Sequence, residues 1–197
     1  CSHTSSPPSY FEKYRKQMQI DEAADLWKNA NAPQSKHLAL GRLARVAYKP
    51  HPKRNPGGLK SLTDGIFAMP TTTDIGWTGF LGVDLEATID LGKPVQIQKI
   101  SVRFLRELRS RIVLPGLLEL SVSDDGKTFR NVGTQDVEDP FGPRKETKSS
   151  VEEIVLKVPA TEARYLRVRA KTVGTLPSWH RAKGTLTWLF VDEIVIQ

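Results

Sequence analysis

Cysteine is almost absent from this sequence, since the only one among its 197 residues is Cys1. An intrachain disulfide is therefore excluded, and so is a zinc finger or an iron–sulfur site built on several thiolates. Long apolar runs are missing too. No stretch approaches the roughly 18 consecutive apolar residues that a membrane-spanning helix needs.

Sequence motifs of catalysis are also missing. There is no HExxH, CxxC, G-x-S-x-G or phosphate-binding Walker loop. Adjacent carboxylates such as Asp124 and Asp125 cannot face each other across a cleft as an acid–base pair. The histidines, which lack the spacing of metal ligands, are His3, His37, His51 and His180. We therefore expect a protein without enzymatic activity.

The composition is that of a globular protein with a basic balance. Hydrophobic residues make up 39% and charged residues 26%, which suits one domain with some length to spare. Lys and Arg number 29 against 22 Asp and Glu, so the formal charge is +7. Arg167, Arg169 and Lys171 alternate and share one face of a predicted strand. That face is either a solvated outer surface or an attractant for an acidic glycan, and no nucleic-acid-binding motif accompanies it.

The N-terminal residues 1–9 are small, polar and proline-containing, which predicts a flexible tether. A cysteine followed directly by such a tether resembles the N-terminus of a mature bacterial lipoprotein. The resemblance implies a lipid anchor on Cys1 and an exported protein held at the cell envelope, on the outer membrane or the cell surface. The alternative is a fragment that happens to begin at a cysteine.

Residues 10–36 are predicted to form a short N-terminal helical spacer. Tyr10, Tyr14 and Met18 follow a spacing of four residues, which is typical of one helix face. Pro33 ends the pattern. The charges are mixed, so we expect this helix to pack on the main domain or to act as a spacer.

From residue 37 to residue 197 the sequence changes to strand-like segments. Residues 100–104 alternate between apolar and polar side chains, as half-buried strands do. Further strands are predicted at 86–91, 118–122, 151–158, 166–168 and 188–196. Residues 124–127 predict a hairpin turn, and residues 134–150 a long polar loop. Several short strands separated by turns predict a mainly β domain, an antiparallel sandwich or jelly roll.

Five segments of this region, taken in order, resemble discoidin-like domains, also called coagulation-factor C-type domains. They are SLTDG at 61–65, LEATIDLG at 85–92, LSVSDDG at 120–126, RYLRV at 164–168 and WLFVDEI at 188–194. With WTGF at 77–80 and PSWH at 177–180, the sequence is most similar to the C-terminal domain of bacterial β-hexosaminidases. The resemblance implies a galactose-binding-like jelly-roll β-sandwich that binds carbohydrate without hydrolysing it. The chain is too short to hold a catalytic barrel of about 250 residues as well.

The resemblance also implies a structural calcium ion. Its ligands would be the carboxylates of Asp64 and Glu193 and the carbonyl of Leu62. Glu193 alternates with Leu189 and Val191, so we expect it to point inward, where a carboxylate needs a partner or a cation. The alternative is an ion pair between Glu193 and an arginine. The sequence also departs from the family pattern, because an isoleucine follows Gly65 where many relatives have a second aspartate.

A sugar site needs an aromatic face and a few polar groups on loops at one end of the sandwich. Trp179, His180 and Arg181 precede the last predicted strand, and Arg109 and Arg111 lie in the loop after the strand at 97–106. Relatives often have an aromatic residue where Arg111 stands. A second aromatic pair is at positions 77 and 80, for which a core position is the alternative.

The sequence therefore predicts a module that binds glycans at the cell envelope, with acidic and amino sugars as candidates. One alternative is a protein-interaction module of an envelope complex. Another is a non-catalytic C-terminal fragment of a hexosaminidase-type glycoside hydrolase.

Overall fold

The computed structural model describes residues 35–144 and 148–197. Cys1, the predicted tether and nearly all of the predicted helical spacer lie outside these residues. No helix in the described ranges is long and apolar enough to cross a membrane. The strands are β1 (Ala44–Val46), β2 (Thr78–Leu81), β3 (Leu85–Arg106), β4 (Leu117–Ser123), β5 (Arg130–Asp136), β6 (Ser150–Lys171) and β7 (Trp188–Ile196). The 3-10 helices are η1 (Pro52–Arg54), η2 (Leu59–Leu62) and η3 (Leu108–Ser110).

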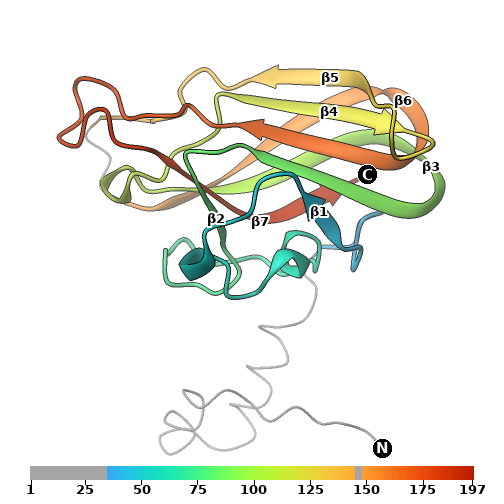
Figure 1. The fold of residues 1–197 in the computed structure, drawn as a ribbon, viewed down its shortest axis with the longest axis horizontal. Coiled ribbons are helices and arrows are strands. Elements are labelled where there is room, and N and C mark those ends of the chain that lie inside the picture. The colour runs from blue at the N-terminus through green and yellow to red at the C-terminus, as the bar shows by residue number, and fades with distance from the viewer. Residues whose placement is uncertain (1–34, 145–147) are drawn as a thin grey trace, which may run out of the picture. The chain divides into compact units, whose positions relative to one another are not determined.

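The strands form an antiparallel sandwich, because β3 and β6 are long enough to bend and join both layers (Figure 1). Their pairing is interrupted between Asp90 and Val95 of β3. One layer contains β2, β7, the second half of β3 and the first half of β6. The other contains β1, the first half of β3, the second half of β6, β4 and β5. The predicted mainly β jelly-roll sandwich is confirmed.

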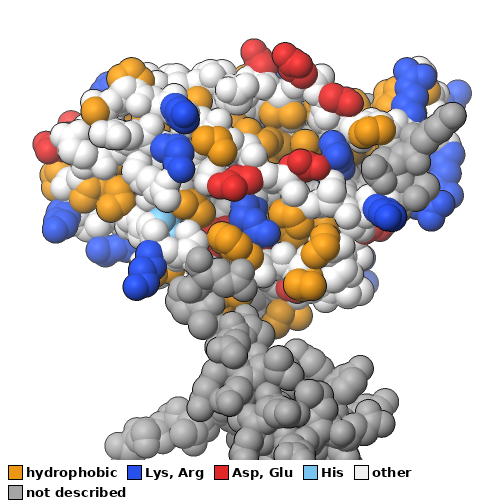
Figure 2. Space-filling view, turned by 180° about the vertical axis from the view of Figure 1, so that it is seen from behind, with side chains coloured by type: hydrophobic (Ala, Val, Ile, Leu, Met, Phe, Trp, Pro, Cys, Tyr) orange, Lys and Arg blue, Asp and Glu red, His pale blue; other side chains and the backbone are white. Residues whose placement is uncertain are grey.

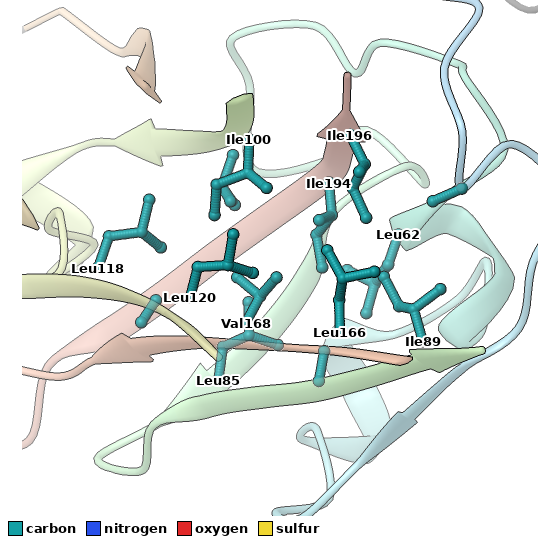
Figure 3. Packing of buried hydrophobic residues seen from close by; sticks show 14 of the residues in the cluster. Leu62, Leu85, Ile89, Ile100, Leu118, Leu120, Leu166, Val168, Ile194 and Ile196 are labelled. Atoms are coloured by element: carbon teal, nitrogen blue, oxygen red, sulfur yellow. The ribbon is translucent and has the colours of Figure 1, made fainter. Parts of the chain in front are cut away.

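The core lies between these two layers (Figure 3). Leu120 of β4 and Val168 of β6 face it from one layer, and Ile194 and Ile196 of β7 from the other. All four side chains are fully buried. Burying a side chain of this size contributes roughly 1.5–3 kcal/mol. The alternation of apolar and polar side chains along the strands therefore identifies residues that pack between the two layers.

Strand β7 contains a bulge that changes which side chains face the core. Arg103 of β3 pairs with Glu193, whereas the next residue, Phe104, pairs with Val191, so Asp192 is the extra residue. Val191 and Ile194 both belong to the core cluster although they are three positions apart. Glu193 thus leaves the core face and lies on the other side of the strand. The prediction that it is buried is confirmed, but the alternation with Leu189 and Val191 is the wrong reason for it.

The loops between strands divide between the two ends of the sandwich (Figure 1). Loops 107–116, 137–144 and 172–187 gather at one end, which we call the loop end. The hairpin at 124–129 and the bends of β3 and β6 lie at the other end. The predicted long polar loop is shorter than expected, since β5 extends to Asp136 and β6 begins at Ser150.

Candidate functional site

The three loops of the loop end are held together by a small hydrophobic cluster of their own. Leu108, Val113 and Leu176 are buried in it, and Phe141 and Ala182 pack against it. These residues come from all three loops. The cluster therefore gives the polar residues on these loops a shared, packed base.

Trp179 stands on this base with 37% of its surface exposed. Its ring lies edge-on to Phe141, with the centroids 5.9 Å apart, and edge-on to His180 at 6.1 Å. The guanidinium carbon of Arg144 lies 4.9 Å from the centroid of the Trp179 ring. The structure thus presents one exposed aromatic ring, held by neighbours from two loops.

His180 and Arg181 follow Trp179 in the same turn. The backbone N–H of His180 donates to the Pro177 carbonyl at 3.0 Å, and its Nδ1 accepts the Ala182 N–H at 3.0 Å. Because Nδ1 is an acceptor, Nε2 is the nitrogen that can bond outward. Arg181 is exposed and has no ion pair with any residue that the structure describes.

Arg109 and Arg111 flank the end of η3 in the neighbouring loop. Arg111 adopts a left-handed backbone conformation with φ 65°, and its carbonyl accepts the Trp188 N–H at 2.9 Å. Neither guanidinium has an ion pair among the described residues. Lys and Arg side chains gather at this end of the domain (Figure 2, right). The structure thus brings the loops of all five predicted residues together, without a direct contact from Arg109 or Arg111 to Trp179.

Phe141 and Arg144 are part of the site, but the sequence did not indicate them. Both lie in the segment that reads as a polar loop. The signal that could have identified Phe141 is a lone aromatic residue in an otherwise polar stretch. The partner of a long-range ring contact cannot be read from local periodicity.

Other arginines of the basic clusters are paired with acids. Arg164 contacts Asp90, and Arg169 contacts both Asp84 and Glu119. Exposed pairs of this kind contribute little to stability. The outer face of β6 is therefore a solvated, largely neutralised surface, whereas three separate loops of the loop end carry arginines that have no ion pair with any described residue.

The second aromatic pair belongs to the core. Trp77 is 1% exposed and its Nε1 donates to the Met69 carbonyl at 2.9 Å, while Phe80 is fully buried. Neither ring can stack on a ligand in this position. The core alternative for positions 77 and 80 is confirmed.

Glu193, the predicted metal ligand on β7, contacts residues that precede β1 and β2. Its Oε2 accepts the Gly65 N–H at 2.8 Å, and its Oε1 lies 3.0 Å from Nε2 of His37. Both side chains are fully shielded from solvent. Burial raises the pKa of Glu193, whereas His37 and the Gly65 N–H oppose that rise. The side chain beside this carboxylate is a histidine, whereas the alternative to a calcium ion was an arginine.

The surroundings of Asp64 and Leu62 also bear on the calcium prediction. Asp64 accepts the Ile66 N–H at 2.9 Å, and burial raises its pKa. Leu62 is fully buried at the end of η2, and the next carbonyl, of Thr63, accepts the Gly41 N–H at 2.7 Å. Calcium needs six to eight oxygen ligands.

N–H groups donate to one oxygen of each of the two predicted carboxylate ligands, Asp64 and Glu193. In the described ranges, no three His, Cys, Asp or Glu residues are placed to hold a metal. The arrangement with His37 in place does not fit a calcium ion, and we derive no role for one. Calcium stays a prediction of the sequence.

Comparisons with known proteins agree with this architecture. The sequence model of the F5/8 type C domain matches residues 63–188. Among solved structures, the module CpGH89CBM32-5 from Clostridium perfringens, in complex with GalNAc-β-1,3-galactose, has 20% identity and a TM-score of 0.52. The match covers 82% of this chain and 99% of that one. Chitosan-binding module 1 of a chitosanase/glucanase from Paenibacillus sp. IK-5 has 16% identity and a TM-score of 0.50, covering 83% and 99%. None of the curated proteins matches the sequence.

Proposed function

The chain belongs to the F5/8 type C domain family, and on that premise we propose that it is a non-catalytic carbohydrate-binding module. Its binding site is the loop end around Trp179. The two modules of similar fold named above carry carbohydrate-binding names or ligands, which supports the same class of ligand for this chain.

The observation that carries this proposal is the exposed ring of Trp179 on a packed base. An aromatic ring stacks on the apolar C–H face of a sugar, while nearby donors bind its hydroxyl groups. Here His180 and Arg181 lie beside the ring in sequence. An exposed Trp179 favours a sugar site, whereas a flat loop end with this residue buried would have favoured a protein partner.

The charge of the loop end narrows the class of glycan. The guanidinium groups of Arg109, Arg111 and Arg181 have no ion pairs among the described residues. Clustered positive charge attracts polyanions. We therefore infer that acidic glycans are preferred over neutral ones. When many copies of the protein bind one polymeric glycan, their combined avidity compensates for the weak affinity of each site.

A glycan array probed with the full chain, at low and at high salt, tests the proposal. Binding that survives high salt supports stacking on Trp179, and binding to acidic glycans that salt abolishes assigns recognition to the arginines. Absence of binding to every glycan would overturn the proposal in favour of a protein-interaction module. The lipid anchor at Cys1 and the envelope location stay predictions, which labelling of the producing cells with a radioactive fatty acid would test.

A further inference from the structure

A second concave site lies at the end of the sandwich opposite the loop end. It is a cavity of about 470 Å³ on the outer side of β1, β3 and β6. Its wall includes Arg42 and Arg45 near β1, Thr88 and Asp90 of β3, and Tyr165 of β6. This volume lies in the range of roughly 300–1,000 Å³ that is usual for small-molecule sites.

The backbone that carries the two arginines is fixed. Gly41 donates its N–H to the Thr63 carbonyl at 2.7 Å, and the Thr63 hydroxyl donates to the Arg42 carbonyl. Arg45 lies in β1 directly opposite Thr88 of β3. Both arginines therefore start from ordered positions, which lowers the entropy lost when they close on a ligand.

Glycines keep the cavity open. Gly92 has φ 83°, and a Cβ atom there would lie 2.9 Å from Nη1 of Arg42. Gly126 has φ 71°, and a Cβ atom there would lie 3.2 Å from Cε1 of Tyr165. A larger residue at either position would strain the backbone and push a wall residue out of place.

The charges of the cavity do not cancel. Asp90 receives hydrogen bonds from Nε and Nη2 of Arg164, both at 2.8 Å, so its charge is balanced. Arg42 and Arg45 are exposed, and neither guanidinium has an ion pair or hydrogen bond with any residue that the structure describes. The cavity thus offers two uncompensated guanidinium groups, which suit a carboxylate or a sulfate.

We propose that this cavity is a second binding site that takes an acidic sugar residue, a uronate or a sulfated sugar, through Arg42 and Arg45. The cavity is wider than a lone anion needs, and the Thr88 hydroxyl stands beside the arginines to bind a sugar hydroxyl. The ring of Tyr165 is flanked by Gly126 and by Arg164, whose guanidinium carbon is 4.9 Å from the ring centroid. Recognition here therefore uses charge and hydrogen bonds and does not use stacking. The site is independent of the one around Trp179.

Isothermal titration calorimetry with the full chain tests this site, using trigalacturonate, galactose 6-sulfate, galactose and inorganic sulfate as probes. The double variant Arg42→Gln/Arg45→Gln removes both free guanidinium groups. The variant Lys99→Gln/Lys157→Gln removes the same charge from a register pair in the other layer. Trp179→Ala removes the ring at the loop end.

We expect at least one acidic sugar to bind the wild type at two sites. The double arginine variant should weaken one of them tenfold or more, the lysine control should leave both within twofold, and Trp179→Ala should weaken only the other. Equal weakening in the arginine and lysine variants would show general charge attraction and overturn the proposal. Loss of all acidic-sugar binding in Trp179→Ala would assign that binding to the loop end alone and would also overturn the proposal. Inorganic sulfate binding as tightly as the acidic sugars would reduce the site to one for simple anions.

Discussion

Nε2 of His37 lies 3.0 Å from Oε1 of Glu193, and neither side chain has any exposed surface. The histidine precedes the first strand, and the glutamate is on the last one. This buried contact therefore ties the beginning of the described domain to its end.

Removal of the His37 ring should destabilise the domain strongly. His37→Ala leaves Glu193 buried with only the Gly65 N–H as partner. Leaving a buried polar group without its partner costs about 1–3 kcal/mol, and the missing ring adds a cavity. Urea unfolding would measure the loss. The double variant His37→Ala/Glu193→Gln should recover part of it, and strictly additive losses would show that the two groups do not interact.

Calcium should have no effect on the wild-type melting temperature. The Gly65 and Ile66 N–H groups donate to the Glu193 and Asp64 carboxylates, and His37 lies beside the other oxygen of Glu193, so an ion would have to displace protein groups. Differential scanning calorimetry in calcium and in a chelator would compare the two states. A melting temperature lowered by the chelator would show that calcium displaces His37, and that the ligand set of Leu62, Asp64 and Glu193 inferred from the resemblance is correct.

The strands that could be predicted from the sequence are those with one face in the core. β7 spans residues 188–196 as expected, because its apolar residues are plain in the sequence. The end of β5 falls in the predicted polar loop, because this edge strand has no fully buried residue and hence no alternation of apolar and polar side chains. Periodicity reports burial, and a strand exposed on both faces gives no such signal.

Several residues of the two candidate sites could not be predicted, because their contacts join segments that are distant in the sequence. The bulge at Asp192 reverses the side on which Glu193 lies, and no local pattern marks it. His37 was noted only as a histidine without metal-ligand spacing, because its partner is on the other terminal strand. Trp179 could be identified from the resemblance, whereas Phe141 and Arg144 meet its ring only in the folded structure.

The pair of Asp90 and Arg164 should make stability depend on pH in the acid range. Arg164 and the Gly92 N–H hold the pKa of Asp90 well below its usual range. The folded state thus binds this proton less readily than the unfolded chain, whose aspartates titrate near pH 3.9. The contribution is present above about pH 3.9 and is lost as the pH falls further. Because both side chains are about 40% exposed, solvent screens the pair, and its contribution to stability should be small.

Urea midpoints of the wild type and of Asp90→Asn between pH 2 and pH 6 measure this effect. The difference between the two proteins should shrink as the pH falls, and Arg164→Gln should behave like Asp90→Asn. A difference that is the same at every pH would mean that the pair does not shift the pKa of Asp90. The stability of Asp90→Asn at pH 6 serves as the reference for each curve.

Trp179 is exposed and Trp77 is buried, so substituting each of them distinguishes a binding role from a structural one. Trp179→Ala removes a ring that is 37% exposed, so unfolding free energy should change by less than about 1 kcal/mol. Loss of the stacking face should weaken glycan binding at least tenfold, as at other aromatic hot spots. Trp77→Ala empties a site that is 1% exposed and should cost about 3–5 kcal/mol.

Chemical unfolding and binding to the best glycan of the array, measured on both variants, check this contrast. If Trp179→Ala unfolds as readily as Trp77→Ala, its ring is structural, and the proposed sugar site around it is wrong. If Trp179→Ala stays folded and binds as well as the wild type, the glycan contacts another surface. Only a folded Trp179→Ala variant that has lost binding is compatible with a sugar stacked at the loop end.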